Sequence, residues 1–381
     1  MLNLCTRRMD DSFVADAKTV ADSGTRFTGR QRLRVSLGCA PPPASSFLYY
    51  DFPDSDEDDN YDGISVDVVA AHTDSVLLRL GNHRCPSATF EDSDYFVYRA
   101  GAAGPPSLSL LPDRDFLTKT ESVYAHSPRL YSRRTGLLRR HGKDLLVVQL
   151  DLWYNRDARQ NMVEFCVLRP CMDVRQWELI EPDDDKVAPW LSGNAVITVG
   201  DRYLCWVDYV SRCCSSGDLI PDYELNDDVF HIKYSMKMGS AGASKVRFVS
   251  IGPHCCCGGP GRSTCAHSRF AFTVTTWTMD LSMDVESPLT WVKDGEIDCE
   301  EVWTLPGYEG LPQANLECPV VSLDDPNVVC FLVSNRYFAT YEDQQVWMIQ
   351  LNIKTKTLLS VVLFSNDPRR AYHHLPAQIQ Y

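Results

Sequence analysis

Short apolar runs of strand type recur along the whole chain, and this pattern constrains the fold more than any other feature. The runs are rich in Val, Ile, Phe, Tyr, Trp and Thr, and clusters of Gly, Pro, Asp and Ser separate them. Such a pattern is typical of β-strands joined by turns, and it lacks the periodicity of long amphipathic helices. So many strands with short connections indicate an all-β sandwich, barrel or propeller with few helices. Strands are expected at residues 32–38, 45–52, 75–80, 94–101, 144–154, 162–170, 194–200, 203–209, 229–234, 245–252, 270–280, 289–295, 327–334, 345–353 and 357–364.

A degenerate internal repeat favours the propeller among these architectures. Each copy contains a strand, a turn and a closing strand, and the copies lie at residues 94–112, 162–182, 270–306 and 346–364. Propeller blades have about four strands and repeat at about 40 to 50 residues, so this chain is expected to hold about five to seven blades. The predicted fold class is therefore all-β and β-propeller-like.

The sequence predicts one large domain after a divergent N-terminal segment. With 381 residues, of which 44% are hydrophobic, the chain has enough apolar surface for a large core. We assign residues 1–30 to the N-terminal segment and residues 31–381 to a single β-propeller-like domain. Within that domain we expect an acidic loop at residues 51–63 and a Cys- and Gly-rich loop at residues 253–267.

Charge and composition exclude two classes of partner. The formal net charge of −14 repels nucleic-acid phosphates and anionic membrane surfaces. No apolar run approaches the roughly 18 residues of a membrane helix, and the start of the chain lacks the apolar core of a signal peptide. The odd number of cysteines, 15, favours reduced thiols over a disulfide framework. We therefore expect a soluble monomer of the cytoplasm or nucleus that binds neither nucleic acid nor membranes.

One basic stretch, residues 133–143, stands out against the acidic composition. It has the residue types of a nuclear import signal or of a patch for an acidic partner. The interleaved Leu137 and Leu138 also fit a turn before the strand expected at residues 144–154.

The Cys- and Gly-rich loop contains the residue types that zinc prefers. Cys255, Cys257, Cys265 and His267 form the candidate ligand set. The spacing matches no standard zinc knuckle, and consecutive cysteines in an extended segment point to opposite sides. A surface loop between two strands is therefore the favoured interpretation, and no cofactor is expected.

The acidic loop resembles the first half of an EF-hand calcium loop. Asp58, Asn60, Asp62 and Gly63 have the required spacing, but Val69 stands where the final bidentate Glu belongs. The residues after Gly63 also have the pattern of a strand instead of a helix. A solvated acidic loop is favoured over a calcium site.

Sequence signatures of catalysis are absent. The chain contains no G-x-S-x-G elbow, no phosphate-binding G-x-x-x-x-G-K-[ST] loop, no H-E-x-x-H pair and no G-x-G-x-x-G after a strand. We expect no enzyme. The alternative is an enzyme whose Asp, His or Tyr side chains gather in the central channel of a propeller.

Two motifs carry a resemblance to a known family. They are the segment from Phe272 to Trp303, with its T-W-T, W-V-K-D and E-x-W elements, and the segment VVSLDDPNVVCF at residues 320–331. The chain resembles the plant family called domain of unknown function 1618 (DUF1618), which is expanded in grasses, with its defining core at about residues 200–340. The resemblance implies a layout similar to the propellers that follow F-box motifs. It supplies no catalytic residues, because the family has no established activity.

The residues that match the family are expected to have structural roles. The tryptophans fill the wedges between neighbouring sheets, the Asp residues cap backbone amides in turns, and the proline fixes the turn before a strand. These residues are Trp206, Asp208, Trp277, Trp291, Trp303, Asp324, Asp325 and Pro326.

The function predicted from the sequence is a non-catalytic module for protein–protein interaction, with its partner bound on the loop-rich face of the blades. The alternatives are the channel enzyme and a zinc-stabilised binding module.

Overall fold

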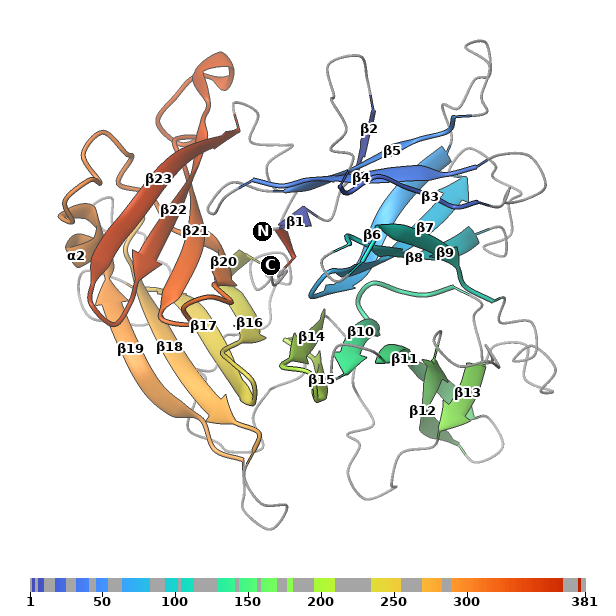
Figure 1. Ribbon diagram of the computed structural model, residues 1–381. Helices are drawn as coiled ribbons and strands as arrows, with labels where there is room; N and C mark the ends of the chain where they lie inside the picture. Colours follow the sequence, from blue (N-terminus) through green and yellow to red (C-terminus); the bar gives the residue numbers. More distant parts are fainter. Residues whose placement is uncertain are drawn as a thin grey trace. The chain divides into compact units, whose positions relative to one another are not determined.

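In a computed structural model of the chain, nearly all the regular secondary structure of the described residues is β-strand (Figure 1). Helical structure in the described residues is short and includes α2 (Cys299–Trp303) and the 3-10 turn η3 (Tyr341–Asp343). No described helix has the length and apolar character needed to span a membrane. The structure describes residues 2–3, 6–9, 18–24, 32–40, 46–53, 64–82, 93–101, 104–112, 129–140, 144–155, 159–169, 177–180, 195–209, 234–254, 269–282, 289–365 and 376–377.

The chain divides into two compact units. The N-terminal unit comprises mainly Leu2–Ala40 and Ser46–Val207, and the C-terminal unit comprises mainly Asp208–Gln378. The two-residue strands β1 (Leu2–Asn3) and β24 (Pro376–Ala377) lie near the ends of the chain.

The N-terminal unit contains three four-stranded sheets and a hairpin. The first sheet has the order β2-β5-β4-β3, in which β2 is parallel to β5 and the other pairs are antiparallel. The other sheets follow the chain order with antiparallel neighbours. The strands are β2 (Arg7–Arg8), β3 (Ala21–Asp22), β4 (Arg34–Gly38) and β5 (Phe47–Asp51); β6 (Ile64–His72), β7 (Ser75–Asn82), β8 (Ser93–Arg99) and β9 (Ser107–Leu110); β10 (Thr135–Arg140), β11 (Asp144–Asn155), β12 (Gln160–Leu168) and β13 (Trp177–Ile180); and the hairpin β14 (Ala195–Val199) and β15 (Tyr203–Val207).

The C-terminal unit contains two four-stranded antiparallel sheets, each in chain order. Helix α2 directly follows the last strand of the first sheet. The strands are β16 (Met236–Ser240), β17 (Lys245–Pro253), β18 (Phe272–Asp280) and β19 (Val292–Asp298); and β20 (Glu317–Val321), β21 (Val328–Ser334), β22 (Val346–Asn352) and β23 (Thr357–Ser365).

The predicted fold class is confirmed: the protein is all-β and β-propeller-like. The described residues form five four-stranded sheets of the kind that makes a propeller blade. The repeat found in the sequence corresponds to the last two strands of four of these sheets, namely β8–β9, β12–β13, β18–β19 and β22–β23. The predicted boundary at residue 30 stays a prediction, although β2 and β3 before it pair with β5 and β4.

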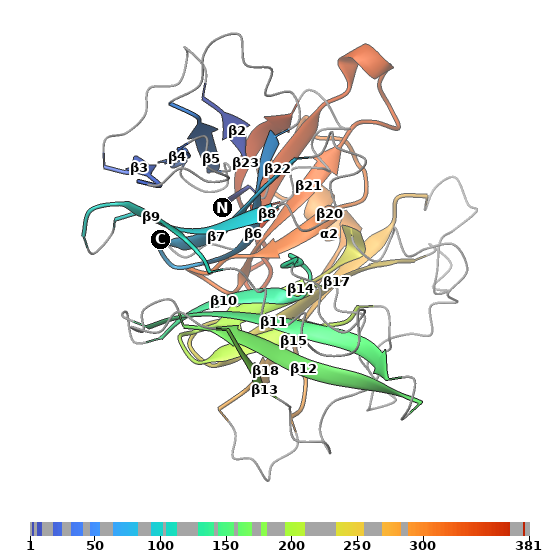
Figure 2. The ribbon, with the colours of Figure 1, turned by 90° about the vertical axis from the view of Figure 1, so that its right-hand side faces the viewer.

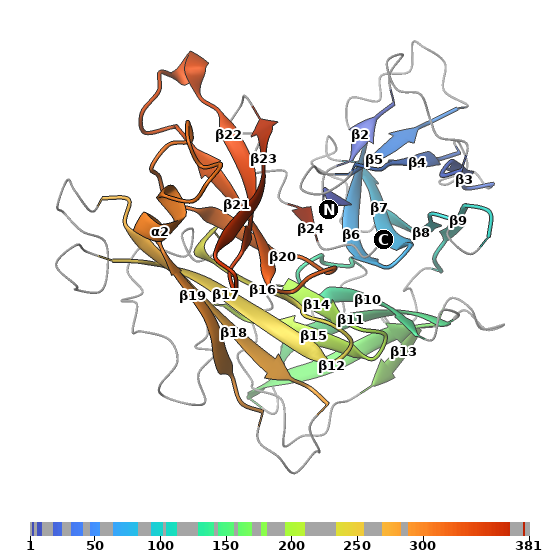
Figure 3. The ribbon, with the colours of Figure 1, turned by 60° about the vertical axis from the view of Figure 1, so that its left-hand side comes forward.

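The core lies between sheets that pack face to face within each unit. In β21 all seven residues are buried, and alternate side chains belong to different clusters. Val329, Phe331 and Val333 pack with residues of the β16–β19 sheet, whereas Cys330 and Leu332 pack on the opposite face of β21. This alternation follows from the two-residue period of a strand, and it places an apolar layer between the two sheets (Figure 3).

The N-terminal unit repeats this arrangement (Figure 2). On β7, Leu78 and Leu80 pack towards the β2–β5 sheet, and Leu77 packs towards the β10–β13 sheet. The β6–β9 sheet is therefore buried on both faces, which explains why its central strands are nearly continuous apolar runs.

Neighbouring sheets are also joined by hydrogen bonds from side chains of one sheet to backbone groups of the next. Most of them pair a hydroxyl or indole group with a backbone carbonyl oxygen. Each such bond satisfies a polar group and fixes the position of one sheet against the other. The pairs are Tyr98 Oη to Thr19 O at 2.6 Å, Leu130 N to Tyr95 Oη at 2.8 Å, Trp177 Nε1 to Pro112 O at 3.0 Å, Thr198 Oγ1 to Leu137 O at 2.9 Å, and Trp206 Nε1 to Arg134 O at 2.8 Å.

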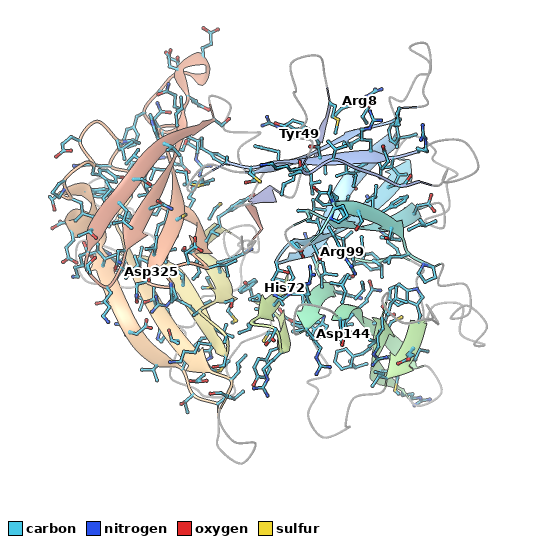
Figure 4. The ribbon with its side chains drawn as sticks, in the orientation of Figure 1. Arg8, Tyr49, His72, Arg99, Asp144 and Asp325 are labelled. Carbon is cyan, nitrogen blue, oxygen red and sulfur yellow. The ribbon has the colours of Figure 1, made fainter. Side chains whose placement is uncertain are left out.

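His72 makes a connection of the same kind at the end of β6 (Figure 4). Its Nδ1 accepts the backbone N–H of Arg139 on β10 at 2.9 Å, and the Arg139 guanidinium forms an ion pair with Asp74. Burial lowers the pKa of His72 to about 4, although a hydrogen bond with the backbone of Gly200 opposes this shift. The imidazole is therefore neutral at neutral pH, with Nδ1 as an acceptor.

We predict that His72 makes the protein less stable in acid. The pKa of His72 is about 4 in the folded protein against about 6.5 when unfolded, so the unfolded chain binds the proton more readily. The stabilising contribution of neutral His72 is complete above about pH 6.5 and falls by about 3 kcal/mol as the pH drops to about 4. The His72→Asn variant keeps an acceptor for Arg139 N–H but does not titrate. Urea unfolding between pH 7 and pH 4 should show a steeper loss for the wild type, and equal slopes would contradict the assignment.

Candidate functional site

An exposed group of aromatic and arginine side chains lies on the C-terminal unit. We call it the aromatic–arginine patch, and it consists of Arg269, Phe270, Arg336, Tyr337 and Phe338. The rings of Tyr337 and Phe338 lie 5.3 and 5.1 Å from the ring of Phe270. Tyr337 is 50% exposed and Phe338 is 57% exposed. Large aromatic side chains this exposed, and in contact with one another, differ from the scattered single apolar residues of an ordinary surface.

Local hydrogen bonds fix the backbone beneath the patch. After β21, Ser334 Oγ accepts the N–H of Arg336 at 3.1 Å, and the Asn335 carbonyl accepts the N–H of Phe338 at 2.8 Å. The Asn335 side chain accepts the N–H of Gln345 at 2.7 Å, which closes the loop before β22. The two aromatic residues are therefore presented on an ordered turn, which reduces the entropy lost when a partner binds.

The two arginines give the patch a positive edge. Arg336 pairs with Glu317 at 2.7 Å, and its guanidinium carbon lies 4.8 Å from the centre of the Tyr337 ring. Arg269 lies 5.4 Å from the ring of Phe270 and 5.5 Å from that of Tyr337, and within the described part of the chain it forms no ion pair. Tyr, Phe and Arg are the residue types enriched in protein interfaces and their hot spots.

A second group, of metal-ligating type, lies in the same unit. His254 follows β17, and Asp298 and Cys299 stand at the junction of β19 and α2. One ligand atom from each of the three residues lies within 4.8 Å of the others. His254 Nε2 is 3.2 Å from Asp298 Oδ2, and Cys299 Sγ is 3.4 Å from Asp298 Oδ1. We call these residues the His-Asp-Cys group, and they are the described residues able to hold a metal ion together.

The β17–β18–β19 pairing explains why these residues meet. Gly252 is opposite Thr273, and Thr273 is opposite Asp298. Alternation along β17 places His254 on the same face as Gly252, so His254 and Asp298 share one face at one end of the sheet. Asp298 also caps α2 by accepting the N–H of Glu300 at 3.0 Å.

Burial affects the Cys299 thiol and the His254 imidazole of this group. Cys299 is 2% exposed, and this burial raises the pKa of its thiol to about 11, so the thiol is protonated at neutral pH. The Nδ1 atom of His254 is buried and has no hydrogen-bond partner among the described residues.

None of the residues proposed from the sequence as metal ligands lies in the described part of the chain. Cys255, Cys257, Cys265 and His267 lie outside the described residues, and so do Asp58, Asn60, Asp62 and Gly63 of the acidic loop. The residues after Gly63 form strand β6, as predicted.

Much of the basic stretch at residues 133–143, which the sequence suggested was a turn, is a strand. Thr135–Arg140 form strand β10, in which Leu137 and Leu138 are buried. The interpretation was wrong because the two leucines pack into the core, and Arg139 is occupied by its ion pair with Asp74.

The family-matching tryptophans lie among other aromatic rings. Trp206 is 5.0 Å from Phe165, Trp277 and Trp291 are 5.4 and 6.1 Å from Phe248, and Trp303 is edge-on to Phe272 at 6.1 Å. Asp208 is buried directly after β15. The structural role expected for these residues stays a prediction, and their positions agree with it.

The turn between β20 and β21 contains the other three family-matching residues. Asp325 Oδ1 accepts the N–H of Asn327 at 2.9 Å (Figure 4). The N–H of Asp324 points to Ser322 Oγ at 3.3 Å, and the Pro326 carbonyl accepts a hydrogen bond from Arg247 of the neighbouring sheet. The turn is therefore tied to β17.

Arg247 is held by a carboxylate that a β-bulge directs towards it. The register shift between Thr276 and Trp277 leaves Asp294 of β19 without a directly opposite residue. Burial would raise the pKa of Asp294, but hydrogen bonds from Thr278 and Thr276 and the Arg247 guanidinium together lower it. Sequence reasoning missed this ion pair, because neither residue belongs to a recognisable motif.

One family model matches part of the chain. Residues 219–330 match the family model described as "Protein of unknown function (DUF1618)", which confirms the predicted family resemblance. No curated protein matches the chain significantly.

Three solved structures that resemble the chain at low similarity have titles that name glycoside hydrolases. A "Glycoside hydrolase" has a TM-score of 0.29 with 8% identity and covers 95% of this chain and 93% of its own. A putative glycoside hydrolase from Parabacteroides distasonis has a TM-score of 0.23 with 9% identity, over 84% of this chain and 72% of its own. A third structure has a title stating that the GH130 family of mannoside phosphorylases contains glycoside hydrolases that target β-1,2 mannosidic linkages in Candida mannan. Its TM-score is 0.24 with 8% identity, and the match covers 79% of this chain and 70% of its own. At these TM-scores the likeness supports no argument about function.

We predict that Arg247→Met lowers the free energy of unfolding by about 3 kcal/mol. The substitution leaves the Asp294 carboxylate and the Pro326 carbonyl without their buried cation, and such losses cost far more than an exposed ion pair. The matched control is Lys356→Met, which removes a half-exposed pair with Glu301 and should cost less than about 1 kcal/mol. Chemical unfolding of both variants measures the difference. Equal losses of unfolding free energy in the two variants would show that the buried contacts of Arg247 do not stabilise the protein.

Proposed function

This chain carries a segment of the DUF1618 family, residues 219–330, and we propose that the protein is a non-catalytic module that binds another protein through its aromatic–arginine patch. The observation that carries the proposal is the contact of Tyr337 and Phe338 with Phe270, at half exposure and on an ordered turn. Each such ring can bury 150–250 Å² (roughly) in an interface, and truncation of a hot-spot aromatic costs about 2 kcal/mol or more.

The chemistry of the patch favours a particular partner. Arg269 stands beside Phe270 without an ion pair in the described part of the chain, so a carboxylate of the partner can be paired there. We propose that the partner inserts an apolar side chain next to an Asp or Glu. The net charge of −14 opposes long-range attraction of acidic proteins, so this recognition depends on short-range contact.

The arrangement of buried ionisable groups supports a non-catalytic role. His72 is neutral and occupied by backbone groups, and Arg247 and Asp294 hold a turn of the neighbouring sheet. Catalytic groups are more typically directed into a cleft, with a pKa close to the working pH. The proposal includes a monomer in the cytoplasm or nucleus, in agreement with the acidic composition and the scattered cysteines.

We predict that Tyr337→Ser with Phe338→Ser weakens partner binding by about 30-fold or more, which corresponds to about 2 kcal/mol. The control is Leu289→Ser with Val292→Ser, since these residues are 55% and 61% exposed on the same unit but outside the patch. Quantitative affinity capture with all three proteins should identify partners that only the patch variant loses. Titration of the purified partner then gives the three dissociation constants.

Three results would contradict the proposal or a part of it. A partner retained by the patch variant binds elsewhere, and a partner lost equally by both variants depends on general surface hydrophobicity. Turnover of a substrate by the purified protein would contradict the non-catalytic part of the proposal.

A further inference from the structure

We propose that the His-Asp-Cys group, His254, Asp298 and Cys299, binds a zinc ion. This site is separate from the aromatic–arginine patch, and the proposal does not depend on whether the patch binds a partner.

The chemistry of the three donors selects the metal. An imidazole, a carboxylate and a thiolate are together the ligand types of zinc, whereas calcium and magnesium prefer oxygen alone. Ligand atoms around a tetrahedral zinc ion lie about 2.0 to 2.3 Å from the metal, so neighbouring ligands are separated by about 3 to 4 Å. The two Asp298 oxygens lie 3.2 Å from His254 Nε2 and 3.4 Å from Cys299 Sγ, and one ligand atom from each residue lies within 4.8 Å of the others. These separations permit a common ion after small adjustments.

Among the described residues, only one nitrogen of the His254 imidazole has a polar partner. One nitrogen faces Asp298, while the buried Nδ1 lacks a hydrogen-bond partner among the described residues. An imidazole binds a zinc ion through one nitrogen, so Nε2, the nitrogen next to Asp298, is the atom that can share an ion with Asp298 and Cys299. The proposal therefore rests on the clustering of the three side chains and on the chemistry of their ligand atoms.

Secondary contacts orient the carboxylate. Thr273 Oγ1 is 3.4 Å from Asp298 Oδ2, and the N–H of Glu300 fixes Oδ1 at 3.0 Å. Hydrogen bonds of this type orient the ligands in zinc sites. The site is thus built on a strand end and a capped helix start.

Binding includes one proton transfer. The S–H bond of Cys299 breaks, the thiolate forms the zinc–sulfur bond, and the proton leaves to water, with no change of oxidation state. The three protein ligands leave one position of a tetrahedral ion for a further donor.

The structural consequence is a cross-link between distant parts of the chain. The ion joins the end of β17 to the start of α2. His254 also donates its backbone N–H to Ala271 at 3.2 Å, next to Phe270. Metal binding is therefore expected to stabilise this end of the β16–β19 sheet.

The test measures zinc binding by the full chain under reducing conditions. Wild-type protein, Cys299→Ser and His254→Gln are titrated with Zn²⁺ against a chelator of known affinity, and bound metal is counted by elemental analysis. Loss of a ligand is expected to weaken binding by at least about 100-fold, more than is typical for a secondary contact. Cys330→Ser is the control, because Cys330 is also buried but lies outside the group, and it should retain wild-type affinity.

Cobalt provides a readout that is specific to the thiolate. Co²⁺ bound to the wild type should give a sulfur-to-cobalt charge-transfer band, and Cys299→Ser should lose it. His254→Gln guards against misfolding, since the His254 side chain is 30% exposed and tolerates replacement better than buried Cys299. Circular dichroism confirms that each variant is folded.

Two results would overturn the proposal. Folded wild-type protein that binds no Zn²⁺ excludes the site. Zinc retained at wild-type affinity by both Cys299→Ser and His254→Gln assigns the metal to other cysteines of the chain.

Discussion

Hydrogen bonds from buried side chains of one sheet to the backbone of the next are the interactions on which the rest of the structure depends. Apolar contact between sheets supplies most of the stabilising free energy, at about 25 cal/mol per Å² buried, but this contact has no direction and tolerates sliding. A buried carbonyl that loses its donor costs about 1 to 3 kcal/mol, so each such pair selects one relative position. Arg247 performs this role between the sheets of the C-terminal unit, and Trp206 and Tyr98 perform it in the N-terminal unit.

The hydrogen bonds between sheets also fix the segments that contain the accepting carbonyl groups. Thr19, Pro112 and Pro326 offer their carbonyl oxygens from turns or strand ends, not from sheet ladders. The segments that contain these carbonyl groups are thereby fixed against the neighbouring sheet. Other turns, such as the one that contains Tyr337 and Phe338, do not hold one sheet against another. They can present side chains for binding.

Most of the strand content could be predicted from the sequence, because alternating or continuous apolar runs report burial directly. The repeat in the sequence was a true signal of blade architecture, since it marks the last two strands of four sheets. Thr135–Arg140 was missed as a strand because its two buried leucines are adjacent and flanked by arginines, so neither alternation nor a long apolar run is visible. Segment 229–234, expected as a strand, lies largely outside the described residues.

Less of the candidate sites could be predicted from the sequence. The Cys- and His-rich stretch pointed to the vicinity of His254, but Asp298 and Cys299 are distant in the chain and only the pairing of β17, β18 and β19 brings them near. Phe270 and Tyr337 likewise meet through tertiary structure. The sequence Asn-Arg-Tyr-Phe after a buried strand was the one local signal for the patch, since aromatic residues in a turn have little reason to be there unless they bind.

The first residues of β18 connect all three features of the C-terminal unit. Phe270, just before the strand, belongs to the patch, Phe272 packs in the core against Trp303, and Thr273 contacts Asp298 from the opposite face. Successive side chains of a strand point to opposite faces, so a slip of one residue would move Phe272 out of the core and Thr273 into it. The fifteen or so apolar side chains around Phe272 make that slip prohibitively costly. The register set by the core therefore positions both the aromatic–arginine patch and the His-Asp-Cys group, and neither site needs its own scaffold.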